Sequence, residues 1–255
     1  RGLALPIHFE HYRGNEKFVK RIYDLIDLME RRRRIVVTPF FAPDECNICD
    51  AILGHQIPYR KSGGYQGAER CRYAILPYED ELADLKITIL KTTYSPQFGK
   101  LAHPDVLGAI LNLGIEREKI GDLIVKDNEL IIFVDEEIEN YIVCNLTRIK
   151  RSNVHFKRYE GEVTYEPQIR YEHKIVSSLR LDVLVSSFAN ISRKKAQELI
   201  RAGLVKVNHV ILEETSYLCN NNSAISIRGH GRFHFKEIVK TTKKDHLVIL
   251  AGKYQ

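Results

Sequence analysis

A serine followed by three cations, at residues 192–195 (SRKK), is the feature of this sequence with the clearest chemistry. Ser192 can cap a helix whose apolar residues Ala196, Leu199 and Ile200 recur at helical spacing. Cations in a first turn meet the positive end of the helix dipole, which costs up to about 1 kcal/mol for each exposed group. We therefore expect an external anion, such as phosphate, to offset this cost and to accept hydrogen bonds from the same turn.

More cations follow in the same C-terminal segment. Arg201 lies on the predicted helix, Lys206 lies on the strand after it, and residues 228–232 (RGHGR) form a flexible, basic loop. From residue 175 onward the chain has 13 Lys and Arg against 6 Asp and Glu, whereas its overall net charge is +6. A solubilising basic tail is the alternative, but such tails lack the apolar periodicity seen here. This charge asymmetry favours a domain that meets nucleic acid.

Two other motifs resemble parts of a metal site and of a nucleotide-binding loop, but the sequence lacks the remaining residues that such sites need. Cys46 and Cys49 form a C-x-x-C motif, with His55 and Cys71 as further conceivable ligands, but a zinc site normally shows two close ligand pairs. Residues 63–67 (GGYQG) are rich in glycine, yet they match neither the P-loop nor the dinucleotide fingerprint and are more typical of a hairpin turn. We therefore predict no metal, no cofactor and no small-molecule substrate.

The elements that position these residues divide the chain into three predicted domains, at 1–80, 81–172 and 173–255. The first combines helices, over residues 15–32 and from a cap at Asp44, with strands at 57–61 and 72–76. The second reads β-α-β-β-α-β: a strand at 85–91, a helix before Gly114, a hairpin of 122–125 and 129–134, a helix capped by Asp135, and a strand at 154–158. This order is the ferredoxin-like arrangement that RNA-recognition motifs share. Its third strand offers only Phe133 for base stacking, so we interpret this domain as structural or protein-facing, with RNA stacking as the lesser alternative.

The last predicted domain has two helices, ending at Gly203, and a set of strands around the turn at Asn208 and His209. Its segments 180–182 (RLD), 192–193 (SR), 205–208 (VKVN) and 227–232 (IRGHGR) resemble the S4 RNA-binding domain. His209 stands where that family usually has glycine, and residues 220–224 lack its usual acidic residue. Both differences concern turn geometry rather than the basic surface. The predicted fold class is therefore α+β, with three small domains, the last of the S4 type.

The rest of the sequence resembles the YlmH family, through residues 63–70 (GGYQGAER), 75–77 (ILP), 103–109 (HPDVLGA) and 113–122 (LGIEREKIGD). The resemblance spans nearly the whole chain. It implies a non-catalytic factor that binds ribosomal and transfer RNA on the large ribosomal subunit, in ribosome-associated quality control or rescue of obstructed nascent-chain complexes. It also implies that Arg180, Arg193 and Lys194 contact RNA.

These arguments define the expected site residues. The predicted RNA-binding surface is a single one and consists of Arg180, Ser192, Arg193, Lys194, Lys195, Arg201, Lys206, Asn208, Arg228 and Arg232. A second contact with RNA or a partner is proposed for Arg31, Arg32, Arg33, Arg34, Arg70 and Arg72, although cations in a last helical turn are explained equally well by the helix dipole.

The alternative function is an RNA-modifying enzyme of the pseudouridine synthase or methyltransferase type, because such enzymes carry the same RNA-binding module. The triplet 180–182 even resembles the Arg-Leu-Asp around a synthase's catalytic aspartate. Here it begins a helix inside the RNA-binding module, where Asp182 is better explained as a first-turn carboxylate. We also find no glycine-rich turn for a methyl donor and therefore expect no catalysis.

The five cysteines indicate reduced thiols in the cytoplasm. No apolar run approaches the roughly 20 residues that cross a bilayer, and the first ten residues resemble no signal peptide. A plastid or thylakoid-linked role, known for some relatives, would need a transit-like segment, and none is seen. The expected location is cytoplasmic, with no membrane partner.

Overall fold

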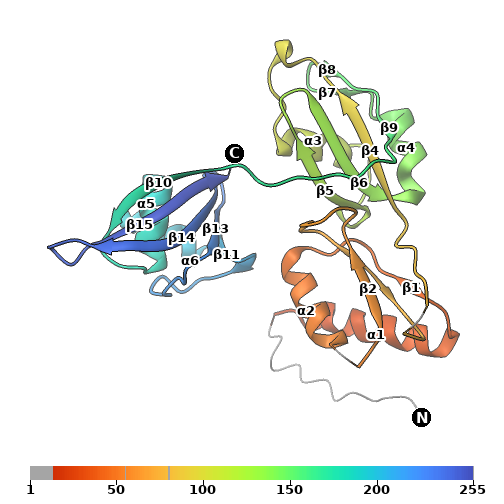
Figure 1. Cartoon of the computed structure of the whole chain (residues 1–255), viewed down its shortest axis with the longest axis horizontal. Helices are drawn as coiled ribbons and strands as arrows, with labels where there is room; N and C mark the ends of the chain where they lie inside the picture. The colour runs from red at the N-terminus through yellow and green to blue at the C-terminus, as the bar shows by residue number, and fades with distance from the viewer. Residues whose placement is uncertain (1–13, 55, 80, 255) are drawn as a thin grey trace. The chain divides into compact units, whose positions relative to one another are not determined.

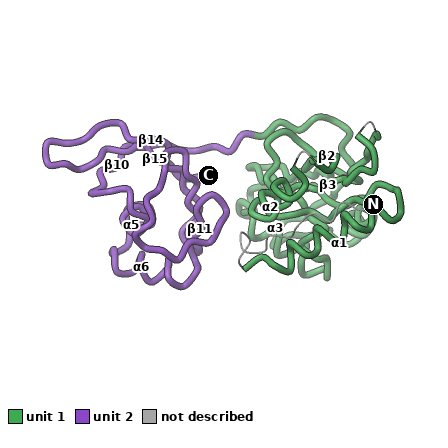
Figure 2. The backbone as a smooth tube through the Cα atoms, turned by 90° about the horizontal axis from the view of Figure 1, so that it is seen from below, with its two compact units in different colours: residues 1–165 green, residues 166–255 purple. Residues whose placement is uncertain are grey.

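The computed structural model describes residues 14–54, 56–79 and 81–254. The chain divides into two compact units: unit 1 extends to Tyr165, and unit 2 begins at Glu166 (Figure 2). The division into three domains stays a prediction, but the second unit begins before residue 173, because its first strand starts at Ile169. In the described part of the chain, no helix is both long and apolar enough to cross a membrane.

The N-terminal part of unit 1 places two helices against a small sheet of order β1-β3-β2 (Figure 1). Its elements are α1 (Glu16–Arg32), β1 (Val36–Val37), α2 (Pro43–Leu53), β2 (Tyr59–Ser62) and β3 (Arg72–Ile75). The expected hairpin is confirmed, since β2 and β3 pair antiparallel across the glycine-rich loop. Asp44 does not cap α2, because Pro43 begins the helix and Glu45 accepts the hydrogen bond from the Ala42 N–H at 2.8 Å.

The rest of unit 1 has the ferredoxin-like order, with strands arranged β5-β6-β4-β9 and all neighbouring pairs antiparallel. Its main elements are β4 (Ile87–Thr93), α3 (His103–Leu111), β5 (Ile120–Val125), β6 (Glu129–Asp135), α4 (Glu139–Asn145) and β9 (Lys157–Arg158). Its short elements are η2 (Pro96–Phe98), η3 (Arg117–Lys119), η4 (Glu136–Ile138), β7 (Arg148–Ile149) and β8 (Ser152–Asn153). Asp135 caps as expected, but it caps η4, which leads into α4: its carboxylate accepts from the Glu137 N–H at 3.1 Å.

The two faces of this sheet are both closed. One face packs on α3 and α4 through a core that includes Leu90, Val106 and Ile132. On the other face, Phe133 is fully buried and stacks on Tyr65 with ring centroids 4.7 Å apart, and Val163 packs into the same cluster. The one residue of β6 that the sequence offered for base stacking is therefore buried, and our interpretation of this domain as structural or protein-facing stays a prediction.

Unit 2 is a six-stranded antiparallel sheet of order β10-β15-β14-β13-β11-β12, with two helices on one side of it (Figure 2). Its elements are β10 (Ile169–Val176), α5 (Leu181–Ala189), α6 (Arg193–Arg201), β11 (Val205–Val207), β12 (Val210–Ile211), β13 (Ser223–Ile227), β14 (Gly231–Thr241) and β15 (Leu247–Tyr254). The hairpin between β11 and β12 forms despite His209: Asn208 and His209 both take positive φ, at 47° and 71°, as a two-residue turn of this kind requires.

Candidate nucleic-acid interface

The start of α6 has the predicted geometry. The Ser192 side chain accepts a hydrogen bond from the Lys195 N–H at 3.2 Å, and the helix buries Ala196 and Ile200 against the sheet. Arg193, Lys194 and Lys195 therefore lie in the first turn of a nine-residue helix, with exposed side chains. The cap fixes where this turn begins, and so fixes the direction in which the cations leave the backbone.

Asp182, in the first turn of α5, holds two of the predicted arginines together. Its side chain is completely buried and accepts from Arg180 Nε and Nη2, both at 3.1 Å, and from Arg193 Nε at 3.0 Å. Gln197, one turn further along α6 than Arg193, donates to the same carboxylate at 2.7 Å. We call Asp182, Arg180, Arg193 and Gln197 the carboxylate cluster.

The electrostatics of the carboxylate cluster leave it positive. Burial raises the pKa of Asp182, but the hydrogen bonds from Arg180, Gln197 and Arg193 outweigh burial and bring this pKa well below its usual range. The carboxylate is thus ionised at neutral pH, and two guanidinium groups share its single negative charge. Their side chains remain 35% and 52% exposed, so they keep unused N–H donors that face solvent.

The expectation that an external anion offsets the cost of the cations in the first turn of α6 needs correction, because carboxylates of the chain itself pair with two of them. Arg193 is already paired with Asp182, and Lys195 is paired with Glu198 at 3.1 Å. Among the described residues, Lys194 and Arg201 form no ion pair, and both are exposed. The charge available to an anion at this helix therefore consists of Lys194, Arg201 and the surplus of the carboxylate cluster.

The predicted single basic surface is wrong, because the sheet separates its members. Val205 and Val207 point into the core beneath the helices, so Lys206 between them points to the opposite face. Arg232 lies on that opposite face too, since its neighbour Phe233 packs in the core. We call the two sides the helix face and the outer face; Arg180, Arg193, Lys194, Lys195 and Arg201 belong to the helix face.

Two further predicted residues have structural roles in turns. The Asn208 side chain accepts from the Ala224 N–H at 2.9 Å, which ties the β11–β12 turn to β13. Arg228 follows β13 and its N–H donates to the Leu204 carbonyl at 3.0 Å, while its side chain is exposed. Asn208 therefore shapes the hairpin, whereas a contact of the exposed Arg228 guanidinium with RNA stays a prediction.

The secondary candidates separate into exposed and buried residues. All four arginines at the end of α1 are exposed; Arg31 pairs with Asp27 at 2.7 Å and Arg33 forms the left-handed C-cap. Arg72 is 6% exposed and pairs with Asp135 at 3.2 Å, so it is a core residue rather than an RNA contact.

Arg70 is likewise used inside unit 1. Its guanidinium donates to the carbonyls of Ile120, Phe40 and Arg117, at 3.0 to 3.3 Å, and burial lowers its pKa. These bonds connect the N-terminal part of unit 1 with the start of β5. The expectation of an RNA contact is thus corrected for Arg70, because its donors are occupied by backbone.

The cysteines form no metal site in the part of the chain that the structure describes. Cys46, Cys49 and Cys71 are all buried in the core of α1, α2 and β3, and all are free thiols. His55, the remaining candidate ligand, lies outside the described residues. Burial raises the pKa of Cys49, as is typical of an inert core thiol.

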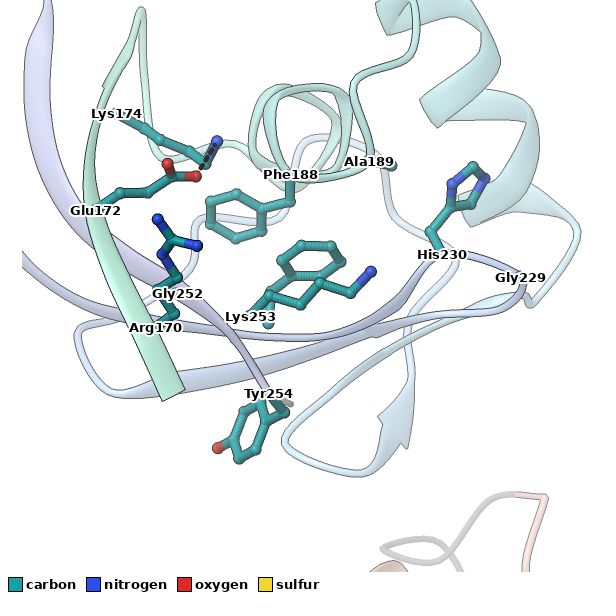
Figure 3. Close-up of a pocket in the computed structure, with 11 residues that line it drawn as sticks. Arg170, Glu172, Lys174, Phe188, Ala189, Gly229, His230, Gly252, Lys253 and Tyr254 are labelled. Carbon is teal, nitrogen blue, oxygen red and sulfur yellow. Dashed lines mark ion pairs between the residues drawn. The ribbon is translucent and has the colours of Figure 1, made fainter. Parts of the chain in front are cut away.

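A cavity of about 860 Å³ opens on the helix face at the C-terminal end of α5 (Figure 3). Phe188 and Phe233 stack with ring centroids 5.4 Å apart, and the Lys253 ammonium lies over Phe233 at 5.6 Å. Arg170 and Lys174 also line the cavity, and Lys174 pairs with Glu172 at 2.8 Å. The cavity thus adds cations to the helix face at the end of α5 opposite the carboxylate cluster.

The sequence did not reveal Asp182 and Gln197 as organisers of the arginines. A signal exists for Gln197, which lies four residues after Arg193 and so on the same side of α6. No local signal exists for Asp182, because its contact with Arg193 depends on how α5 and α6 pack.

Comparisons with known proteins agree with this architecture. Three family models match consecutive segments: "YlmH, N-terminal" over residues 14–79, "Putative RNA-binding domain in YlmH" over 80–162, and "S4 domain" over 179–225. The Bacillus subtilis (strain 168) protein named "Ribosome-associated protein quality control protein P2" is 30% identical over 243 residues, covering 93% of this chain and 95% of the relative. The solved structure "Cell division protein ylmH from Streptococcus pneumoniae" has a TM-score of 0.50 at 23% identity, over 62% of this chain and 96% of that chain. This last likeness shows the fold alone.

Proposed function

Because the chain belongs to the YlmH family, we propose that it is a non-catalytic factor that binds ribosomal and transfer RNA at the large ribosomal subunit, in ribosome-associated quality control. The match to RNA-binding domain models supports binding to RNA. The relative named for ribosome-associated quality control supports the ribosome as the place of action. In this proposal the factor works in the cytoplasm on obstructed nascent-chain complexes.

The observation that carries the proposal is the helix face of unit 2. The carboxylate cluster fixes two half-exposed guanidinium groups beside Lys194, which has no carboxylate partner among the described residues. Guanidinium groups held in a fixed orientation are suited to phosphate oxygens, because their donors need no reordering on binding. Lys194 adds a mobile charge at the same helix end.

The salt dependence of RNA affinity tests this assignment. If the helix face neutralises about four phosphates, log affinity for structured RNA falls against log salt with a slope of about −3 to −4. Lys194→Ala is expected to flatten the slope by about one unit, and Arg193→Ala with Lys194→Ala by about one to two units. Lys17→Ala, an exposed lysine of α1, is the matched control and leaves the slope unchanged. An unchanged slope in the double variant would contradict the proposed surface.

The environment of Asp182 also supports a non-catalytic role over the pseudouridine synthase alternative. A catalytic aspartate must reach its substrate, whereas Asp182 is fully buried and its oxygens accept from three side chains of its own chain. Mass spectrometry of ribosomal RNA from cells with and without the protein is expected to show the same modifications. One missing pseudouridine or methyl group would contradict the proposal.

A further inference from the structure

The outer face of unit 2 gathers aromatic rings across three strands. Tyr171 on β10 and His234 on β14 are both register partners of Gly252 on the strand between them, β15. Because Gly252 has no side chain, the two flanking side chains approach each other across it. The Tyr171 hydroxyl lies 2.7 Å from His234 Nδ1, and the ring centroids are 5.8 Å apart.

A third ring and two cations extend this group. Tyr254, also on β15, lies edge-on to His234 with centroids 6.4 Å apart, and the Arg232 guanidinium stands 4.5 Å over the Tyr254 ring. The Lys236 ammonium lies 5.3 Å over the Tyr171 ring. We call these five side chains the outer strip: Tyr171, Arg232, His234, Lys236 and Tyr254.

The helices of unit 2 do not cover the outer strip. Phe233 and Phe235 alternate with the strip residues of β14 and pack beneath α5 and α6, so the strip faces away from both helices. Figure 3 shows the same alternation on β15: Lys253 lies on the side of Phe188, whereas the ring of Tyr254, a residue at the edge of the cavity, points away from Phe188. Tyr171 remains 38% exposed.

The rings and cations of the outer strip match the chemistry of an unpaired nucleotide. Nucleobases stack on tyrosine and histidine rings and on guanidinium planes, while nearby cations attract the phosphates of the same strand. On the corresponding sheet face of unit 1, Phe133 is not available for stacking, because it is buried under Tyr65. The S4 match covers residues 179–225, so β10, β14 and β15 lie outside the matched segment.

We propose that the outer strip is a second RNA-binding site, which takes unpaired nucleotides by stacking their bases on Tyr171, Tyr254 and the Arg232 guanidinium. This inference rests on the proposed function, because it adds a single-stranded segment to the RNA that the helix face binds. The two sites recognise different parts of RNA: the helix face binds phosphates, and the outer strip binds strands that carry bases in preference to strands without them.

The test measures fluorescence anisotropy of the full chain with three labelled probes. They are a 12-nucleotide single-stranded RNA, a strand of the same length and charge with abasic sites, and a structured RNA hairpin. Base stacking predicts that the base-bearing strand binds about 5- to 100-fold more tightly than the abasic strand. Tyr171→Leu with Tyr254→Leu is expected to remove most of this preference and to leave the affinity for the hairpin and the salt slope unchanged.

Controls separate stacking from a structural effect. Tyr171→Phe with Tyr254→Phe keeps both rings and is expected to retain most of the preference for bases. Tyr78→Leu removes a tyrosine of unit 1 that is 60% exposed and is expected to change nothing. Thermal unfolding monitors the fold of every variant. If the double leucine variant does not unfold cooperatively, each single leucine variant, which keeps the other ring, is measured instead and is expected to lose part of the preference.

The outcomes distinguish the two proposals. Equal affinity of the unmodified chain for the base-bearing and abasic strands overturns the outer strip while leaving the proposed function intact, provided the hairpin binds. A base preference that is undiminished in the leucine variants also overturns it, because the bases then stack elsewhere. If none of the three probes binds, the proposed function itself fails, and the outer strip with it.

Discussion

At the scale of single residues, one buried carboxylate determines how two guanidinium groups are presented. Asp182 has no contact with solvent, so its charge is tolerated only because Arg180, Arg193 and Gln197 donate to it. The cluster keeps one net positive charge, and its arginines are held by bonds to α5 and α6 at once. A surface lysine offers no comparable fixed geometry.

Replacing this carboxylate measures its contribution to the stability of the fold. We expect Asp182→Asn to lower the free energy of unfolding at pH 7 by about 2 kcal/mol, less than for a fully buried pair because both arginines can turn to solvent. Urea denaturation measures the loss. The control is Asp127→Asn, whose carboxylate pairs with Lys100 on the surface and is 79% exposed; this variant is expected to be nearly neutral.

The same carboxylate predicts a pH dependence. The folded-state pKa of Asp182 is lowered, so its stabilisation is present above the unfolded-state pKa of about 4 and is lost as the pH falls below that value. We therefore expect the stability difference between the unmodified chain and Asp182→Asn to shrink between about pH 4 and pH 2. A difference that stays constant over this window, measured by urea denaturation, would show that Asp182 does not act through its charge.

At the scale of elements, the cap of α6 connects stability with the placement of cations. Among the described residues, Ser192 is the one whose side chain caps the N-terminus of this nine-residue helix. We expect Ser192→Ala to cost about 1 kcal/mol in urea denaturation. Ser216→Ala is the control, because the hydroxyl of Ser216 bonds only an exposed Glu214 side chain. Equal stability of the two variants would contradict the role of the cap.

Substitution by alanine is expected to have opposite effects on stability at two glycines of unit 1. A Cβ on Gly121, in β5, would lie 2.7 Å from the Phe40 ring and 3.1 Å from Phe133 Cβ, so Gly121→Ala is expected to cost about 1 to 3 kcal/mol. A Cβ on Gly108, within α3, meets nothing within 4 Å, so Gly108→Ala is expected to gain about 0.5 to 1 kcal/mol. Thermal unfolding of both variants checks the signs. A neutral Gly121→Ala would contradict the close packing of Phe40 on β5.

The element order of this fold could be predicted because it depends on local patterns. The alternation of β4, the apolar runs of β5 and β6, and the caps at Asp135 and Ser192 are visible over short stretches of sequence. Two-residue strands such as β7 and β8 carry too few side chains to show a period. The closed sheet face over Phe133 was not predictable, because Tyr65 and Val163 reach it from distant segments.

The sequence predicted which cations are exposed on unit 2 better than it predicted the face of the sheet on which each of them lies. Residues of both faces appeared in the sequence as one basic cluster, since net charge along the chain does not record which side of a sheet a residue takes. The alternation within β11 places Lys206 opposite the helix face, and this could have been read once the core positions Val205 and Val207 were assigned. That the Asp182 carboxylate binds Arg193 could not be predicted, because this contact depends on how α5 and α6 pack against each other.

At the scale of the whole molecule, unit 2 has what a separately folding domain needs. Its core is built from its own residues, and its first strand, β10, pairs along its length with its last, β15. No helix or strand is assigned to residues 159–168, and the residues just before β10, Glu166, Pro167 and Gln168, are exposed. Interruption of the chain here breaks no strand pairing and exposes no part of the unit 2 core.

We therefore expect a fragment of residues 166–255 to fold on its own and to show cooperative thermal unfolding by circular dichroism. Limited proteolysis of the full chain is expected to cut near Glu166 first, because exposed backbone without strand pairing is cleaved most readily. Since the helix face lies entirely within the fragment, its salt slope on structured RNA should equal that of the full chain. A folded fragment with a shallower slope would mean that unit 1 contributes phosphate contacts, and the exposed arginines at the end of α1 would be the first to test. A fragment that does not fold would instead show that unit 2 depends on the rest of the chain.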